Sequence, residues 1–522
     1  MMLSVSSVLM LIQTISNLKI ESFAVVMPYD VDLPPEHMAF YFNNNPLAAD
    51  ACRKNDDCPY KKHLDKKVCW GYEETCTEEA KYSDPVCQGD SKGWVKSKKE
   101  QKEMFFKQGD FGYIKERKQE MKVLCNEGDS LLECTTYTRF CRAKNIMFDF
   151  NKLLDMPEPM RYREDVIGEG QVGGHCTLDK KRLKNEGHHK SPLQSWFAEL
   201  EHFIELPGHP IKEQMCDAII DRPTFILKLD ATVNMYHHFC DFFNLYASLH
   251  LNNTFSKDVY IFIWDTIPYR SNFGITWKAF TNFPLLNLGQ FKGQKVCFMD
   301  AVFPLLPRMI FGMYYNMPLV PGCQGSGLFH AFNRHIIHRL GIKQQRSSEN
   351  KVRITLLTRS TQYRRILNED ELIKALEKIP ECTVKKVNFN GRIPFIEQLE
   401  ISHNSDVLIG MHGAGLTHML FQPDWAVIFE IFNCEDENCY RDLARLRGLK
   451  YITWEKRDKL FPEDKGHHPT LGAHAKFTNY AFDVHEFVRL VNIAVYHVKN
   501  HPVFQNKHNI TNSKSPPSHT EL

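Results

Sequence analysis

Residues 409–418 read IGMHGAGLTH, an apolar run that predicts a buried strand and then breaks into a glycine-spaced turn. Gly413 and Gly415 permit backbone conformations closed to other residues, and they leave main-chain N–H groups uncovered by side chains. A strand that passes through such a turn into a helix N-terminus is a place where phosphate groups bind. The same spacing also occurs in tight turns that bind nothing, so the rest of the chain must decide between the two interpretations.

Apolar runs alternate with amphipathic ones on both sides of this turn. A helix is predicted after Asn368, where an Asn cap and an acidic first turn precede apolar residues at helical spacing. This alternation is typical of parallel sheets with crossover helices, so we expect an α/β fold with two sheets facing a cleft and a linker through residues 330–351. The predicted strands are 224–229, 259–264, 295–298, 353–358, 383–389, 406–411 and 426–432.

The composition is that of an ordinary globular protein. The chain has 522 residues, enough for two or three domains, and 25% of them are charged. The net charge of +2 argues against a nucleic-acid-binding protein. A lysine-rich run at 96–102 also contains glutamates, which indicates a solvated helical face.

Both ends of the chain indicate a lumenal protein. We predict a signal peptide at residues 1–22, because its apolar core is too short to span a bilayer. The tail at 501–522 ends in His519, Thr520, Glu521 and Leu522, which resembles the retrieval signal of the endoplasmic reticulum. No other segment has the length of apolar sequence that a membrane span needs. We therefore expect a soluble protein of the endoplasmic reticulum lumen that binds the retrieval receptor.

The cysteines fit that compartment. Eight of the sixteen fall between residues 52 and 141, in a stretch with little aliphatic periodicity and no paired Cys-x-x-Cys spacing. Disulfides are therefore favoured over zinc in a cysteine-rich region at 23–150, with the connectivity left open. Cys434 and Cys439 are close enough in sequence to close a local loop. Asn252 and Asn509 are acceptors for N-glycans if they reach the surface.

A polar stripe follows the strand predicted at 224–229. On a helix, Asn234, His237, Asp241 and Asn244 would share one face of an otherwise apolar segment. One interpretation is a helix with one solvent-exposed face and a structural histidine. The other makes His237 a general base near a helix N-terminus, oriented by Asp241.

A second polar feature follows the strand predicted at 353–358. Arg359 lies directly after this strand, with Tyr363, Arg364 and Arg365 close behind. A guanidinium at a strand end can bind a diphosphate through two hydrogen bonds. Together with the glycine turn between His412 and His418, it could stabilise a departing nucleotide diphosphate without a metal.

These motifs together resemble a family of inverting glycosyltransferases related to the plant xylosyltransferases. The motifs that carry the resemblance are Asn234-x-x-His237-x-Phe239-x-Asp241, Leu305 to Arg308, Tyr314 to Leu319, Thr358 to Arg364, Gly410 to His418 and Gly466 to Thr470. The full set, with the cysteine-rich start, is most similar to members that transfer one N-acetylglucosamine from UDP-N-acetylglucosamine to Ser or Thr of EGF-like domains, as in Notch-type receptors and matrix proteins.

The resemblance implies a GT-B-like fold with two Rossmann-like domains, at 151–340 on the acceptor side and 341–500 on the nucleotide-sugar side. It implies His237 and Asp241 as catalytic residues, and Asn234, Arg359, Tyr363, His412, Gly413, Gly415 and His418 as substrate-binding residues, with no tightly bound cofactor. Other members carry an Asp-x-Asp after Ala279-Phe280-Thr281, where this chain has Asn282, Phe283 and Pro284. This departure puts a divalent-ion requirement in doubt, and Asp265 is the nearest substitute. The alternatives are another donor or acceptor, such as UDP-xylose or an O-mannosyl glycan, and a non-catalytic EGF-repeat chaperone.

Overall fold

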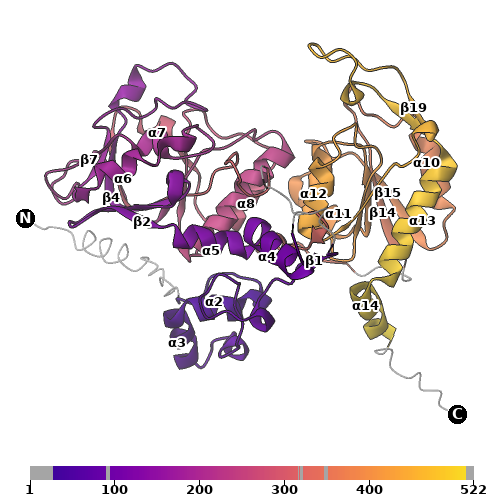
Figure 1. Ribbon diagram of the computed structural model, residues 1–522, viewed down its shortest axis with the longest axis horizontal. Helices are drawn as coiled ribbons and strands as arrows, with labels where there is room; N and C mark the ends of the chain where they lie inside the picture. The colour runs from indigo at the N-terminus through magenta and orange to yellow at the C-terminus, as the bar shows by residue number, and fades with distance from the viewer. Residues whose placement is uncertain (1–26, 90–94, 316, 318–320, 346–350, 513–522) are drawn as a thin grey trace, which may run out of the picture.

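Two lobes, each built on a β-sheet, lie side by side, with a small helical region against the first lobe (Figure 1). The computed structural model describes residues 27–89, 95–315, 317, 321–345 and 351–512. The predicted signal peptide and the predicted retrieval signal at 519–522 lie outside the described residues. The helical region contains α2 (Met38–Asn44) and α3 (Pro46–Lys54), and α4 (Lys98–Gly109) and α5 (Phe111–Gln119) connect it to the lobes.

The first lobe contains a mixed sheet. Its parallel part consists of β8 (Ala218–Ile220), β9 (Thr224–Leu227), β10 (Tyr260–Ile263), β11 (Leu286–Asn287) and β12 (Lys295–Phe303). The sheet continues from β12 through β4 (Cys141–Asp149), β3 (Leu131–Cys134), β2 (Lys122–Asn126) and β6 (Thr177–Leu178), with β5 (Val172–Gly174) and β7 (Phe203–Glu205) off this path. Since β9, β10 and β12 are parallel, their carboxyl ends meet at one edge of the sheet.

The second lobe contains a five-stranded sheet in which every pair is parallel. Its order is β15 (Cys382–Val387), β14 (Val352–Leu357), β16 (Val407–Gly410), β17 (Val427–Glu430) and β18 (Lys450–Thr453). The crossovers include α10 (Glu369–Glu377), α11 (Phe395–His403) and α12 (Cys439–Arg447), and α13 (Val484–Asn500) packs on the sheet. The strand order reverses between β14 and β16, and ligands of parallel sheets bind outside the carboxyl ends of strands at such a reversal.

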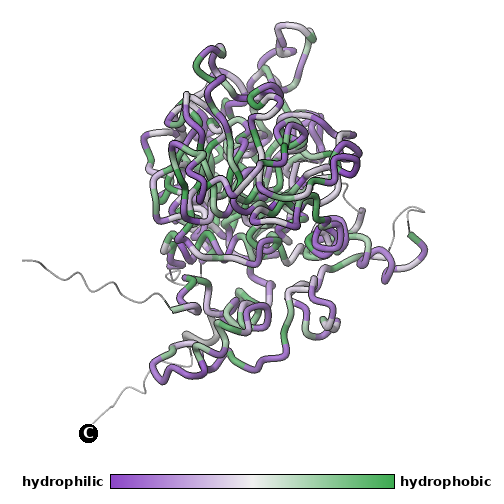
Figure 2. The backbone as a smooth tube through the Cα atoms, turned by 90° about the vertical axis from the view of Figure 1, so that its left-hand side faces the viewer, coloured by the Kyte–Doolittle hydropathy of each residue, from purple (hydrophilic) through white to green (hydrophobic). Residues whose placement is uncertain are grey.

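The two lobes share one hydrophobic core. α8 (Met235–Asn252) of the first lobe and α9 (Gly327–Arg339) lie between the sheets, and their apolar side chains join a cluster that includes Leu357 and Leu408 of the second sheet. The ring of Phe239 on α8 lies 5.3 Å from that of Phe421 in the second lobe. A separate cluster covers the other face of the second sheet, under α10 and α13. Figure 2 shows that hydrophobic backbone segments are concentrated toward the inside of the molecule.

All seven predicted strands are confirmed, but the boundaries between regions differ from expectation. Strands β2, β3 and β4 belong to the first sheet, so the cysteine-rich region predicted at 23–150 does not end where the first domain begins. These strands pair locally, β2 with β3 and β3 with β4, and were missed because charged and polar residues interrupt their apolar alternation. The linker predicted from residue 330 is also wrong in its first half, since α9 extends to Arg339 and is mostly buried.

Six disulfides connect the chain, in agreement with the predicted chemistry. They are Cys52–Cys58, Cys69–Cys76, Cys87–Cys323, Cys125–Cys176, Cys134–Cys141 and Cys216–Cys297. Cys434 and Cys439 are both free, so the local loop predicted for them is wrong. The Cys87–Cys323 bridge joins β1 (Val86–Cys87) to β13 (Cys323–Gln324) across 236 residues of sequence.

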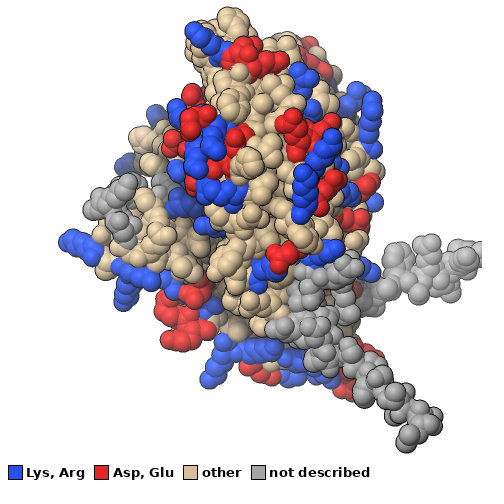
Figure 3. All heavy atoms as spheres, turned by 90° about the vertical axis from the view of Figure 1, so that its right-hand side faces the viewer, with Lys and Arg blue, Asp and Glu red and all other residues tan. Residues whose placement is uncertain are grey.

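Charges of both signs are interspersed on the outer face of the second lobe, which carries α10 and α13 (Figure 3). Among the described residues, no helix has the length and apolar character that crossing a bilayer would require. The remaining elements are α6 (Lys180–Lys184), α7 (Phe197–Leu200), β19 (Leu460–Pro462), β20 (Tyr480–Phe482) and α14 (Pro502–Asn512), together with short 3-10 turns.

Candidate active site

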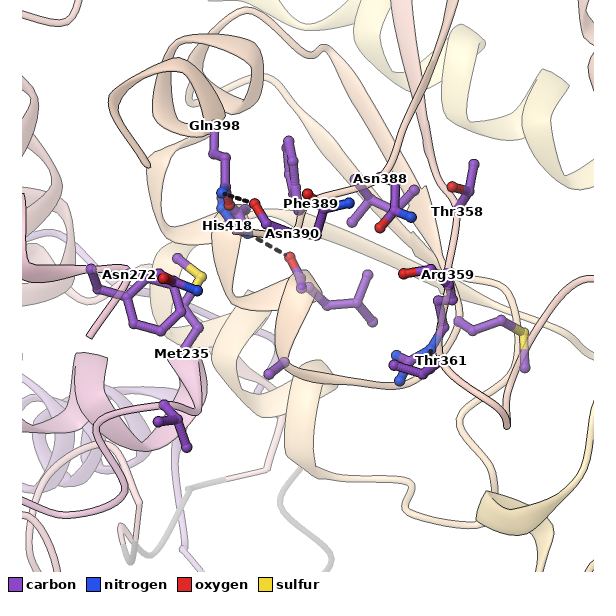
Figure 4. Close-up of a pocket in the computed structure, with 18 residues that line it drawn as sticks. Met235, Asn272, Thr358, Arg359, Thr361, Asn388, Phe389, Asn390, Gln398 and His418 are labelled. Carbon is purple, nitrogen blue, oxygen red and sulfur yellow. Dashed lines mark hydrogen bonds between the residues drawn. The ribbon is translucent and has the colours of Figure 1, made fainter. Parts of the chain in front are cut away.

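A pocket of about 360 Å³ lies between the lobes, at the reversal point of the second sheet. Its second-lobe wall comes from the segments that follow β14, β15 and β16, and the segment before α8 together with Asn272 and Phe273 closes it from the first lobe (Figure 4). Arg359 lies at one end of the pocket, whereas His418, Asn390 and Gln398 lie at the other. The described lining contains no carboxylate side chain.

Two arginines converge at the first end of the pocket. The Nη1 atoms of Arg359 and Arg364 lie 3.4 Å and 3.1 Å from the carbonyl oxygen of His412, and both donate to it. Burial, and then the charge of Arg364, lower the pKa of Arg359 to about 10. Both side chains remain charged at neutral pH, so an anion at this end would relieve their repulsion.

The glycine turn lets Arg359 approach the backbone. Gly413 has a φ of +153°, and a Cβ atom there would lie 2.3 Å from Nη1 of Arg359. A Cβ atom on Gly415 would meet only Leu357, at 3.6 Å. A 3-10 helix (Ala414–Phe421) begins within the turn, so its first N–H groups lie at the pocket. This geometry fits a bound phosphate, and the assignment of Gly413 and Gly415 to the diphosphate stays a prediction.

The two histidines of the turn have different environments. The buried ring of His412 pairs with Glu430 through Nδ1 at 2.8 Å, so only its carbonyl meets the arginines. Nδ1 of His418 donates to the carbonyl of Gly415 at 2.8 Å, and burial lowers the pKa of His418 to about 4. His418 is therefore neutral, and its Nε2 has no hydrogen-bond partner among the described residues. The ring of Phe389 packs on the ring of His418, with centroids 4.2 Å apart.

His237 lies on the first turn of α8, beside the pocket-lining Met235 but not itself in the pocket lining, and it is paired with Asp230 instead of Asp241. Its Nδ1 lies 3.1 Å from Oδ2 of Asp230 and 3.2 Å from Nη2 of Arg308, while Arg308 binds the same carboxylate through Nε at 2.7 Å and Nη2 at 3.2 Å. Burial raises the pKa of Asp230, but the hydrogen bonds from His237 and Arg308 outweigh burial and hold it at about 2. Asp230 is thus a carboxylate at any physiological pH, and the histidine side chain keeps 22% of its surface exposed.

Asp241 has a supporting position. It accepts a hydrogen bond from Nδ1 of His238 at 2.8 Å, and both side chains are fully buried. It also accepts from the backbone N–H of Asp230 at 3.1 Å. The predicted orientation of His237 by Asp241 is therefore wrong. Helical spacing placed the two residues on one face, but the loop before α8 brings Asp230 closer.

Asp230 and Arg308 are the residues that sequence reasoning left without a role. Asp230 follows a predicted strand directly, and a carboxylate at a strand end is the signal that could have identified it. Arg308 lies in one of the recognised motifs, yet its partner is 78 residues away in sequence. No local pattern predicts such a pair.

Three other predicted residues have structural surroundings of their own. Asn234 is the N-cap of α8, because its side chain accepts from the N–H of Tyr236 at 3.0 Å. Tyr363 packs on Phe477, with ring centroids 5.4 Å apart. Asn252 is partly exposed at the end of α8, whereas the side chain of Asn509 lies outside the described part of the chain. Their assignments to substrate and to glycans stay predictions.

The segment that departs from the family pattern lies far from the pocket edge. The N–H of Asn282 donates to Lys257, and Thr281 donates to Val259, just before β10. These contacts lie at the amino ends of β9 and β10, whereas Asp230 and Asp265 follow the carboxyl ends. Asp265 pairs with Arg161 at 2.8 Å. The Asn282 position therefore does not fit a metal that would contact a diphosphate in the pocket, and the carboxylate of Asp265 is already paired with an arginine.

The chain is similar to known glycosyltransferases. The family model Glycosyltransferase 61 matches residues 235–429, which include α8 and the glycine turn. EGF domain-specific O-linked N-acetylglucosamine transferases from Pan troglodytes, Xenopus laevis and Drosophila melanogaster are 51%, 52% and 50% identical to the chain. The alignments cover 92%, 90% and 92% of this chain and 92%, 91% and 94% of those proteins.

Among solved structures, the heptosyltransferase TibC in complex with ADP-D-beta-D-heptose is 15% identical, with a TM-score of 0.21, over 56% of this chain and 78% of that one. A likeness this low supports no conclusion about the fold. The sequence identity to the three transferases is much higher, and their alignments extend through both lobes and the helical region. The chain belongs to the EGF domain-specific O-linked N-acetylglucosamine transferases of the glycosyltransferase 61 family.

Proposed function

We propose that this protein transfers one N-acetylglucosamine from UDP-N-acetylglucosamine to Ser or Thr hydroxyls of EGF-like domains, with inversion at the sugar carbon. The observation that carries the proposal is about 50% identity to named transferases, combined with a pocket that Arg359 lines from one lobe and a histidine–carboxylate pair at the start of α8, whose Met235 lines the same pocket from the other lobe. We also propose that the two lobes form the GT-B arrangement of two Rossmann-like domains. The all-parallel second sheet, with its order reversal at the pocket, supports it.

The donor would lie along the pocket with its diphosphate at Arg359 and its base at the opposite end. The arginines and the N–H groups of the turn would neutralise the charge that develops on the departing UDP. The rings of His418 and Phe389, which pack on each other, would form one wall of the uracil site. This contact would be through ring surfaces, because Nε2 of His418 is buried.

The acceptor hydroxyl would react at His237. When Nδ1 donates to Asp230, Nε2 carries a lone pair and can take the hydroxyl proton. The hydroxyl oxygen then attacks the sugar carbon, the bond to the β-phosphate oxygen breaks, and that oxygen leaves with the electron pair as part of UDP. Asp230 would stabilise the imidazolium that forms, and Arg308 would hold Asp230 in place.

No step in this scheme needs a divalent ion. The proposed diphosphate end contains guanidinium groups where metal-dependent enzymes have carboxylates, and the described lining supplies no carboxylate ligand. The six disulfides support residence in the lumen of the secretory pathway. We propose the endoplasmic reticulum, with retrieval through His519 to Leu522. Secretion after removal of these four residues would be the expected result.

The test is an incubation of the purified protein with one disulfide-bonded EGF-like repeat and UDP-N-acetylglucosamine, in buffer containing a chelator. Mass spectrometry should show one added N-acetylhexosamine, and His237→Ala should reduce the rate by about two to four decades while UDP still binds. A parallel incubation with UDP-xylose tests the donor. An unmodified repeat, or modification only with UDP-xylose, would contradict the proposal.

A further inference from the structure

Four exposed apolar side chains belong to segments of the first lobe that adjoin His237, Asp230 and Arg308. Val233 is 83% exposed and lies just before α8, Ile267 is 43% exposed and follows β10, and Phe311 is 65% exposed and follows β12. Tyr162, 50% exposed, comes from the segment before β5. We call these four residues the apolar rim. The segments that follow β9, β10 and β12 lie at the carboxyl edge of the first sheet, the same edge as His237.

Hydrogen bonds and an ion pair join three of these segments, those that contain Val233, Ile267 and Tyr162. Ser271 donates to the carbonyl of Thr232 at 2.7 Å, which joins the segment after β10 to the one before α8. The N–H of Ile267 donates to Asp265, and Asp265 pairs with Arg161 beside Tyr162. The phenol of Tyr162 is close enough to Asp230 and Arg308 for their charges to act on its pKa, which burial raises. The apolar rim is therefore part of the mouth of the site.

Two members of the apolar rim have an unfavourable backbone. Tyr162 has a φ of +63° and Phe311 a φ of +55°, in the left-handed region that bulky residues rarely adopt. Such conformations cost free energy and are concentrated at functional sites. Here the unfavourable backbone belongs to exposed aromatic rings. Folding alone gives no reason to place an aromatic residue at either position.

Three arginines of the mouth are paired with carboxylates. Arg161 binds Asp265, Arg163 binds Asp165, and Arg308 binds Asp230. A partner that approaches His237 therefore meets apolar surface and these ion pairs. An exposed apolar surface around a reactive group is typical of a protein-binding site.

We propose that the apolar rim is the docking surface for the folded acceptor domain, and that Tyr162 and Phe311 are its main contacts. The inference rests on the proposed function, since the acceptor hydroxyl must come within hydrogen-bond distance of Nε2 of His237. A domain that places a hydroxyl there must cover the residues around it. Small disulfide-rich domains have too little core to bury all their apolar residues, so they offer an apolar surface to match.

The experiment measures transfer to one folded EGF-like repeat at saturating UDP-N-acetylglucosamine, with Tyr162→Ala and Phe311→Ala as variants. Each should raise KM for the repeat about five- to thirtyfold and leave kcat within about threefold, because aromatic residues dominate protein interfaces. Hydrolysis of the donor without acceptor, UDP affinity and the melting temperature should stay near wild type. Tyr496→Ala on α13 and Phe461→Ala on β19 are matched controls, since these rings are 72% and 51% exposed on the other lobe.

The possible outcomes test the docking surface and the proposed function separately. Unchanged KM in both variants of an active enzyme overturns this inference alone. The same repeat can also be reduced and alkylated, which unfolds it. If the two variants raise KM for this unfolded repeat as much as for the folded one, the inference is also overturned, because the rim would then bind a linear peptide instead of a folded domain. A wild-type protein that modifies no repeat overturns the proposed function together with the inference.

Discussion

Replacing Asp230 with Asn should remove most of the activity and leave the nucleotide site intact. The carboxylate has its pKa lowered from 3.8 to about 2 although burial raises it. At about 1.4 kcal/mol for each pKa unit, its partners stabilise the charged form by about 2.5 kcal/mol net. Only 5% of the side-chain surface is exposed, so solvent screens this interaction weakly. If His237 accounts for half of that energy, loss of the charge alone slows the reaction about tenfold.

A change in the tautomer of His237 should reduce the activity of Asp230→Asn further. An Asn amide can present its NH₂ group to Nδ1 of His237, and this bond would favour the proton on Nε2, where it cannot act as a base. We therefore expect kcat to fall by about two to three decades in Asp230→Asn, within the usual contribution of a general base. UDP affinity, measured by calorimetry, should change less than about threefold because Asp230 does not line the pocket.

Asp265→Asn is the matched control. Asp265 is also a buried carboxylate after a strand of the same sheet, and it also pairs with an arginine, but no histidine contacts it. Its substitution should leave kcat at saturating acceptor within about threefold of wild type. A kcat near wild type in Asp230→Asn, with the same melting temperature, would refute the assignment of Asp230 and His237 as a catalytic pair.

Arg359→Ala should weaken UDP binding by about ten- to a hundredfold in calorimetry, the loss expected for a charge-assisted hydrogen bond. Gly413→Ala should reproduce part of this loss, because its Cβ would displace Nη1 of Arg359, whereas Gly170→Ala, where a Cβ would meet no atom within 4 Å, should not. Cys323→Ala should lower the free energy of unfolding by up to about 5 kcal/mol in urea titrations, since its disulfide closes 236 residues, against about 2 kcal/mol for Cys141→Ala, whose disulfide closes 7. Burial raises the pKa of Asp110 from 3.8 to about 6, so the folded state binds its proton more tightly than the unfolded state and this group's contribution to stability falls as pH rises from 4 to 6. Asp110→Asn should flatten that slope in urea titrations at about pH 4 and pH 6, and an unchanged slope would contradict the assignment.

Local patterns predicted the strands of the second sheet well. The residues of IGMHGAGLTH form β16 and the glycine turn as expected, because a buried parallel strand is apolar on both faces. The helix predicted after Asn368 is also present as α10. Its cap is different, however: the Asn368 side chain bonds the backbone of Phe482 on β20 instead of an N–H of its own helix. The side chain thus pairs with backbone groups of β20, and the sequence alone did not predict that β20 lies beside this helix.

The proposed catalytic half of the site was harder to predict because its residues come from separate segments. Helical spacing placed His237 and Asp241 on one face, but His238 lies between them and takes the carboxylate of Asp241. The carboxylate that meets His237 comes from the loop before the helix, and Arg308 comes from beyond β12. Composition and periodicity describe single elements, whereas this cluster depends on how three elements meet.

The shared core explains how the two halves of the site keep their relative position. Phe239 on α8 contacts Phe421 at the end of the 3-10 helix that begins in the glycine turn, and Phe395 on α11 also packs on Phe239. Phe239 is two residues from His237, and α11 precedes β16, which leads into the turn. The element that carries the proposed base therefore packs directly on the elements that carry the proposed leaving-group site. Because protein cores resist deformation, this packing holds the imidazole and the arginines in register across the cleft without a ligand bound.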